Sequence, residues 1–137
     1  MSKQIYINLC VNDLDKSKEF FSKLGFTFNP QFTDQNGACM IIDEDHIYVM
    51  LIVPTFFKTF TTKEIADATR ATEVITALSM DSREAVDTIV DTALANGATV
   101  TRATEDHGWM YLRSINDLDG HIREFAYMDV SAFPQQS

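Results

Sequence analysis

The sequence predicts an α+β fold built from two tandem βαβββ modules. The order strand, helix, strand, strand, strand occurs twice along the 137 residues. Asn8–Asn12 matches Ala77–Asp81 where a strand passes into a helix, and 45–47 likewise matches 120–122 where the last strand begins. A ferredoxin-like or other α+β sheet is the alternative that the strand–helix start leaves open.

The element order sets the expected organisation of the chain. We expect a single domain over residues 1–129 and a polar, frayed C-terminal tail over 130–137. Within that domain, module one spans about 3–54, a connector spans 55–72, and module two spans about 73–129.

In module one, alternating apolar residues predict a first strand, and helical spacing over 14–24 predicts a helix that Asn12-Asp13 caps and Gly25 ends. A hairpin turn is expected at Asp34–Gly37, because Asn-Gly accepts positive φ cheaply. The threonine-rich connector should contain one or two short helical turns. The strands of this module are expected at 5–11, 26–32, 38–42 and 46–53.

In module two, Asp81 and Glu84 form a capping box, which predicts a helix that ends at Asn96-Gly97. Asp117–Gly120 is expected to be a turn, because the later acidic positions of a calcium loop are missing. The strands of this module are expected at 73–80, 99–104, 109–114 and 121–128.

Composition excludes several classes of function. With 20 acidic and 11 basic residues, the net charge of -9 disfavours nucleic acid and anionic membrane surfaces as partners. We expect a cytoplasmic protein, because the sequence shows neither a signal-peptide pattern nor an apolar run of the ~18 residues that a membrane span needs. Cys10 and Cys39 are far apart and lie in apolar runs, which favours buried thiols over a disulfide.

The chain resembles the glyoxalase/bleomycin-resistance/dioxygenase (vicinal oxygen chelate) superfamily. The resemblance lies in Ile7–Ser17 with Leu24–Phe26, and in Asp117–Phe125, which is similar to the closing signature of that family. More narrowly, three stretches resemble bacterial predicted lactoylglutathione lyases: Phe26–Gln31 with Thr33-Asp34, Phe56–Phe60, and Asp106–Tyr111. The resemblance implies that the two βαβββ modules form an open, curved mixed sheet around a cleft, which their concave faces line. In metal-dependent members, the first and last strands of each module supply ligands to a hard divalent ion that acts as a Lewis acid.

The four ligand positions carry over poorly. The first strands offer Asn8 and Ala77, and the last strand of module one offers Val49 or Met50, depending on a one-residue choice of register. Glu124 alone keeps a ligand-type side chain, whereas catalytic zinc sites use about three protein ligands. We therefore expect no cofactor, with a weakly bound divalent metal at Glu124 as the alternative.

Glu124 is the candidate general base, or an acceptor for substrate in the cleft, where apolar walls such as Met50 would raise its pKa. The alternative is a carboxylate that pairs with an arginine and only stabilises the fold. Asn8 would either hold a ligand or satisfy Glu124. Met50 is expected to line the cleft.

Trp109, Tyr111 and Arg113 alternate along one strand. On the concave face they would bind an aromatic or anionic ligand, which is the arrangement we favour, whereas on the convex face they would pack on a helix or a partner subunit. His107, at a turn, is a candidate for proton transfer or a merely solvated side chain.

Other candidates favour structural roles. The matching positions of His46 and His121 favour a role inherited from the repeat. Phe56, Phe57 and Phe60 favour core or subunit-interface packing over a lid on the cleft.

The sequence thus predicts a glyoxalase-like protein with a degenerate metal site that binds or sequesters a small organic compound. The alternative is an enzyme, a lyase or isomerase of the lactoylglutathione lyase type that uses Glu124, and a third hypothesis gives the chain a vestigial cleft and a functional dimer surface. We expect a small-molecule ligand and a homodimer.

Overall fold

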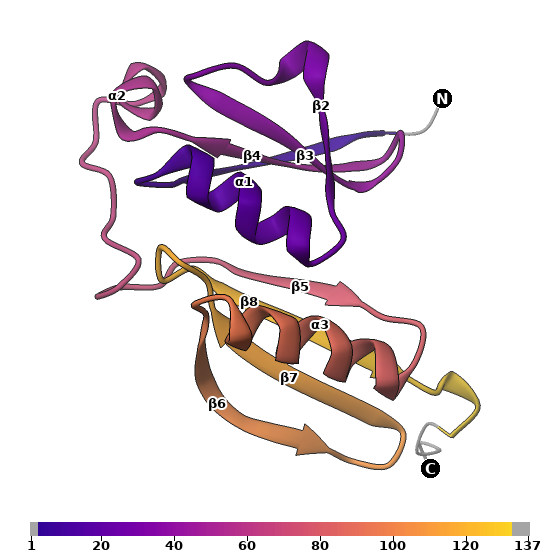
Figure 1. The fold of residues 1–137 in the computed structure, drawn as a ribbon. Coiled ribbons are helices and arrows are strands. Elements are labelled where there is room, and N and C mark those ends of the chain that lie inside the picture. The colour runs from indigo at the N-terminus through magenta and orange to yellow at the C-terminus, as the bar shows by residue number, and fades with distance from the viewer. Residues whose placement is uncertain (1–2, 133–137) are drawn as a thin grey trace. The chain divides into compact units, whose positions relative to one another are not determined.

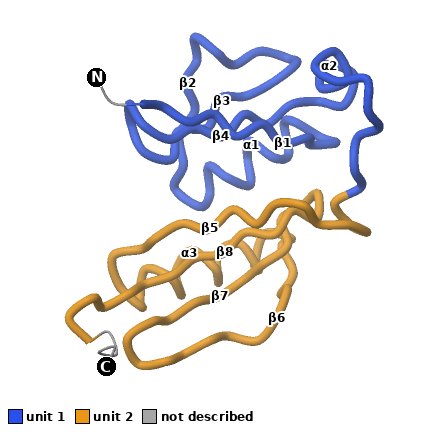
Figure 2. Tube along the Cα trace, turned by 180° about the vertical axis from the view of Figure 1, so that it is seen from behind, with its two compact units in different colours: residues 1–67 blue, residues 68–137 orange. Residues whose placement is uncertain are grey.

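The computed structural model describes residues 3–132, which form two compact units with a boundary between Asp67 and Ala68 (Figure 2). Each unit contains one four-stranded mixed sheet with a long helix packed on it (Figure 1). The boundary falls inside the predicted connector. Both sheets are open, so the predicted α+β fold with two βαβββ modules is confirmed.

Unit 1 has the strand order β1-β4-β3-β2, with β1 parallel to β4 and the other pairs antiparallel. The helix α1 packs against β3 and β4, and the Asp13 carboxylate caps it by accepting from the Lys16 N–H at 3.1 Å. The elements are β1 (Ile5–Cys10), α1 (Leu14–Lys23), β2 (Thr27–Asn29), the 3-10 turn η1 (Pro30–Phe32), β3 (Gly37–Asp43), β4 (Ile47–Ile52), α2 (Pro54–Phe57) and η2 (Lys58–Phe60).

Unit 2 repeats this topology with the order β5-β8-β7-β6, in which β5 is parallel to β8. The helix α3 packs against β7 and β8 (Figure 1). The elements are β5 (Ile75–Ser79), α3 (Arg83–Ala95), β6 (Thr99–Asp106), β7 (Met110–Asn116), β8 (Ile122–Met128) and the 3-10 turn η3 (Val130–Ala132). The rest of the predicted C-terminal tail, residues 133–137, lies outside the described residues.

The strand expected over 26–32 is only half formed. β2 stops at Asn29 because Pro30 has no N–H to donate to a sheet, and Pro30–Phe32 forms η1 instead. The Asn29 side chain accepts from the Gln31 N–H at 2.9 Å and caps this turn. As a result, β2 pairs with only part of the length of β3.

The turn at Asp34–Gly37 forms for a different reason from the predicted one. The Asp34 carboxylate accepts from the N–H groups of Asn36, at 2.8 Å, and Gly37, at 3.2 Å, and neither residue has a positive φ. The space at position 37 favours glycine, since a Cβ there would lie 3.3 Å from the Leu51 carbonyl oxygen, which is a tight contact. The reason for glycine at position 37 is therefore the close approach of β3 to β4, and not a positive φ in the turn.

The cap of α3 is Ser82 and not Asp81. The Ser82 hydroxyl accepts from the Ala85 N–H at 3.0 Å. A cap must directly precede the first helical residue, which is Arg83, so Asp81 comes one position too early. The predicted box therefore marked the right helix with the wrong capping residue.

The register of the two parallel strand pairs shows which residues of the two modules are equivalent. Asn8 faces Met50 across β1 and β4, and Ala77 faces Glu124 across β5 and β8. Met50, and not Val49, is therefore the counterpart of Glu124. Val49 is buried in the core, with 1% of its surface exposed.

Each unit has its own apolar core between helix and sheet. Cys39 belongs to the core of unit 1, and burial raises the pKa of its thiol, whereas Cys10 is half-buried. Within residues 3–132, no helix is long and apolar enough to cross a membrane. The most deeply buried apolar residues of unit 1 include Val11, Phe20, Phe21, Met40, Val49 and Leu51, and those of unit 2 include Val86, Val90, Ile115 and Phe125.

Candidate functional site

The two faces of the unit 2 sheet differ in what covers them. Tyr111 and Arg113 of β7 hydrogen-bond to Asp87 of α3, so they lie on the helix side. Successive strand residues point to opposite faces, which places Ser114 and its neighbour Glu124 on the other side. We call the side of this sheet away from α3 the open face of unit 2.

Four residues form a continuous row across the open face of unit 2, one from each strand. Arg102 of β6 faces Ser114 of β7, Ser114 faces Glu124 of β8, and Glu124 faces Ala77 of β5. Arg102 Nη2 donates to Glu124 Oε2 at 2.9 Å, and the Ser114 hydroxyl donates to the same oxygen at 3.2 Å. We refer to these four residues as the Arg102 row.

Further polar groups extend the row at the β6 edge. Arg102 also donates to Glu105, and His107 Nε2 lies 3.5 Å from Glu105 Oε2. The hydrogen bonds to Glu124 and Glu105 raise the pKa of Arg102, and the guanidinium lowers the pKa of Glu105 through a hydrogen bond and its charge. Arg102 is therefore a permanent cation held between two carboxylates.

Glu124 is largely shielded, whereas its partner is not. The side chain of Glu124 is 12% exposed and that of Arg102 is 42% exposed. The alternative considered from the sequence, a carboxylate paired with an arginine, is thus present in the structure. A pair that is open on the arginine side remains reachable by a small molecule.

The equivalent face of unit 1 is apolar and aromatic. Asn8 and Met50 lie on the opposite side of their strands from the buried Val49. The rings of Tyr6 and Tyr48, on the same side, stack with centroids 4.8 Å apart, and Tyr6 remains 48% exposed. We call this side the open face of unit 1.

The residues at the four ligand positions do not fit a tightly held divalent ion. In unit 1, Asn8 offers a neutral amide whose Nδ2 donates to the Tyr6 carbonyl at 3.2 Å, and Met50 offers a thioether that prefers soft metals. In unit 2, Ala77 offers no donor, and Glu124 already bonds to Arg102. Among residues 3–132, no group of three or more His, Cys, Asp or Glu side chains has the geometry to hold a metal.

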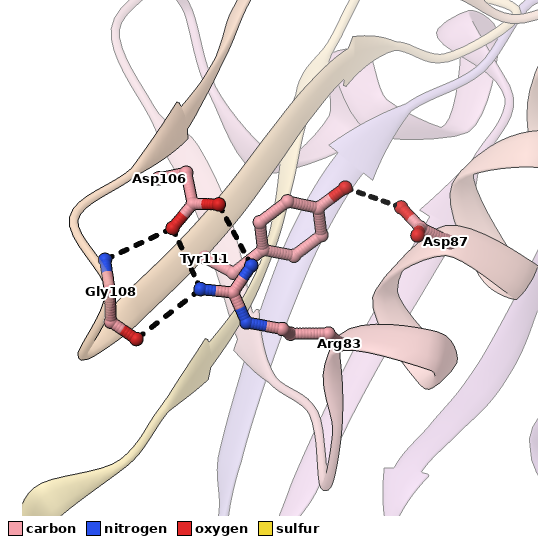
Figure 3. Close-up of polar contacts among 5 residues, drawn as sticks. All are labelled: Arg83, Asp87, Asp106, Gly108 and Tyr111. Carbon is pink, nitrogen blue, oxygen red and sulfur yellow. Dashed lines mark hydrogen bonds and ion pairs between the residues drawn. The ribbon is translucent and has the colours of Figure 1, made fainter.

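Tyr111 and Arg113 do not wall the open face, contrary to the favoured arrangement. The Tyr111 hydroxyl donates to Asp87 Oδ1 at 2.7 Å, as Figure 3 shows, and Arg113 Nη1 lies 2.9 Å from Asp87 and 3.0 Å from Asp91. The hydrogen bond from Tyr111, together with Arg113, lowers the pKa of Asp87, and that hydrogen bond and burial raise the pKa of Tyr111. These side chains fasten α3 to β7.

The turn between β6 and β7 is also tied to α3. Arg83 binds Asp106 through two hydrogen bonds of 2.7 and 2.8 Å, and Nη2 donates to the Gly108 carbonyl at 3.2 Å (Figure 3). Its guanidinium also lies 4.8 Å from the centroid of the Tyr111 ring. Arg83 and the Gly108 N–H lower the pKa of Asp106.

This fixed turn presents two of the predicted residues together. The rings of His107 and Trp109 stack with centroids 6.3 Å apart. The Trp109 carbonyl accepts from the Asp129 N–H at 2.8 Å, which secures the turn from the end of β8 as well. His107 thus lies beside Glu105, and the Trp109 ring stacks on it.

The remaining candidates lie elsewhere. His46 and His121 each close a turn before the last strand of their unit through backbone hydrogen bonds. Phe56 and Phe60 meet edge to face at 5.1 Å with 38% and 61% of their surfaces exposed, so they are not core residues. The Asp117 carboxylate accepts from the Asp119 and His121 N–H groups and pairs with buried Arg123, which confirms a turn there.

Sequence reasoning missed the partners that define this site. Neither Arg102 nor Ser114 stands out in the sequence. Once the strand register is known, both are identified, because Arg102 and Glu124 lie on either side of the small residue Ser114 in the sheet. Tyr6 was also missed. Its alternation with Asn8 placed it on the same face, and this was the available signal.

Comparison with protein families supports the predicted resemblance. Residues 3–42 match the family model described as the bleomycin resistance protein-like N-terminal domain. A search of curated proteins finds no match.

Solved structures share the fold over nearly the whole chain. A hypothetical protein from S. aureus is 29% identical with a TM-score of 0.76, and the match covers 93% of this chain and 95% of that one. A glyoxalase/bleomycin resistance protein/dioxygenase family enzyme from Burkholderia phytofirmans is 17% identical with a TM-score of 0.72, covering 90% and 96%. A fosfomycin resistance protein from Listeria monocytogenes is 16% identical with a TM-score of 0.66, covering 100% and 96%. The superfamily resemblance is confirmed.

The clamp between Tyr111 and Asp87 predicts a specific pH dependence. Asp87 has a lower pKa in the folded chain than in the unfolded chain, so its stabilising contribution is present above its ordinary pKa and is lost as the pH falls through the lowered value. Tyr111→Phe removes the first cause of that shift. We expect the variant to lose about 1 kcal/mol at neutral pH, and the Asp87 carboxyl to titrate at higher pH in NMR.

Tyr127→Phe is the matched control, since Tyr127 is the cross-strand neighbour of Tyr111 on β8. It removes one hydroxyl without touching Asp87. Equal behaviour of the two variants in urea unfolding and in the Asp87 titration would contradict the clamp.

Proposed function

We propose that this protein binds and sequesters a small organic molecule on the open face of one of its sheets, without a tightly held catalytic metal. One observation carries the proposal: of the four ligand positions, Asn8, Met50 and Ala77 supply no strong hard-metal donor, and Glu124 is paired with Arg102. The glyoxalase/bleomycin-resistance fold suggests small-molecule binding or modification.

The chemistry of the open faces favours a ligand with both polar and apolar parts. In unit 2, Ile75 and Met128 share the face of the Arg102 row by alternation, and both are about half exposed, at 51% and 44%. The open face of unit 1, taken by itself, likewise combines the exposed ring of Tyr6 and the Met50 side chain with the amide of Asn8. A few placed polar groups among apolar ones are typical of sites for small organic ligands.

An enzyme is the second candidate, and one observation favours it. Both hydrogen bonds to Glu124, from Arg102 and Ser114, reach Oε2, and within residues 3–132 no hydrogen bond reaches Oε1. Oε1 is therefore available to accept a proton from a substrate carbon. In this alternative the protein is a lyase or isomerase of the lactoylglutathione lyase type with Glu124 as general base.

A ligand screen tests the binding proposal. We expect at least one member of a library of small organic compounds to raise the Tm of the wild-type protein, by roughly 8 °C at a hundredfold excess over Kd. Ala77→Leu, which places bulk beside Glu124, should weaken that ligand at least tenfold in calorimetry. Val100→Leu, at an exposed position facing the other side of β6, is the matched control and should not. Equal affinity in both variants, or no ligand, would contradict the proposal.

Metal content and turnover separate the two candidates. Protein purified without tags or chelators should contain well under one equivalent of nickel, zinc, manganese or iron. It should also show no turnover of the hemithioacetal of methylglyoxal and glutathione above background. One equivalent of metal that Glu124→Gln removes, or a clear rate that the same variant abolishes, would favour the enzyme and overturn sequestration.

We also propose that the protein is a cytoplasmic homodimer. Exposed Phe32, Phe56 and Phe60 of unit 1 support an association surface, because aromatic residues are enriched at interfaces. Light scattering at micromolar concentration should give twice the mass of the 15.5 kDa chain. A monomer under these conditions would be inconsistent with this assembly.

A further inference from the structure

We propose that the guanidinium of Arg102 is the resident cation of the open face of unit 2 and takes, beside Glu124, the place of a divalent ion. The inference rests on the proposed function and deepens it, because it names the group that makes the site independent of metal. The Arg102 row provides the geometry that supports it.

The row has the dimensions that such a replacement requires. Neighbouring strands lie about 4.8 Å apart, so two strand spacings, or roughly 10 Å, separate the backbones of Arg102 and Glu124. An extended arginine spans this gap only if the residue between them is small. Ser114 is small, is 3% exposed, and adds its own hydrogen bond to the carboxylate.

The strand β6 is shaped so that Arg102 points along this row. The pairing of β6 with β7 shifts register between Val100 and Arg102 and again between Arg102 and Glu105. Such irregularities re-aim side chains. Here they bring Arg102 and Glu105 to the same face, where one guanidinium bonds to Glu105 and Glu124.

The charges of this cluster explain why an added ion is disfavoured. Glu105 and Glu124 carry two negative charges, and Arg102 offsets one and occupies the space between them. A divalent ion would have to displace the guanidinium or bind next to it, at a cost in repulsion. A guanidinium donates N–H hydrogen bonds and forms no coordination bonds. A ligand that binds at Arg102 therefore places its acceptor oxygens against these N–H groups.

Removal of the cation should therefore create a metal site. We expect Arg102→Met to bind Mn²⁺, titrated as MnCl₂ and followed by electron paramagnetic resonance, at least tenfold more tightly than the wild-type protein. Arg102→Lys keeps a cation and should gain nothing, and the double variant Arg102→Met with Glu124→Gln should lose the gain. Arg83→Met is the matched control, because it frees the carboxylate of Asp106 and leaves the Arg102 row intact.

Circular dichroism of each variant checks that the fold persists, and Arg102→Gln replaces Arg102→Met if the latter does not fold. Equal Mn²⁺ affinity in the folded neutral variant and the wild-type protein overturns this inference, as does an equal gain in Arg102→Lys. Neither result touches the proposed function, which instead fails if the wild-type protein carries stoichiometric metal or binds no small organic ligand.

Discussion

The parallel pairing of the first and last strand in each unit is the constraint on which the candidate site depends. The pairing of β1 with β4 and of β5 with β8 fixes which residues stand beside each other, because a slip of one residue would turn every side chain to the opposite face. Glu124 meets Ala77, and Met50 meets Asn8, as a result of backbone hydrogen bonds. The chemistry of both open faces follows from this register.

Much of the fold was readable from the sequence because it depends on local patterns. Alternating apolar residues identified the strands, and Asp13 marked the start of α1. The errors occurred where one residue changed the local chemistry, as at Pro30, which ended β2, and at Ser82, which took the capping position from Asp81. These are effects of a missing N–H and of a shift by one position.

The candidate site was less readable because alternation separates two faces without showing which one carries the helix. Alternation correctly places Tyr111 and Arg113 on the same face of β7. That face is the α3 side, where both side chains hydrogen-bond to Asp87. Arg102 depends on irregular pairing of β6, which no periodic pattern encodes. The acidic composition likewise gives no indication that the two faces of unit 2 use their ion pairs differently, one to hold a helix and the other to enclose a carboxylate.

The fixed position of Trp109 has a spectroscopic consequence. It is the single tryptophan of the sequence, and it lies in a turn that Arg83 and Asp129 secure within unit 2. Indole emission therefore reports directly on unit 2. Tyrosine gives no such selective signal, because Tyr6 and Tyr48 lie in unit 1 whereas Tyr111 and Tyr127 lie in unit 2.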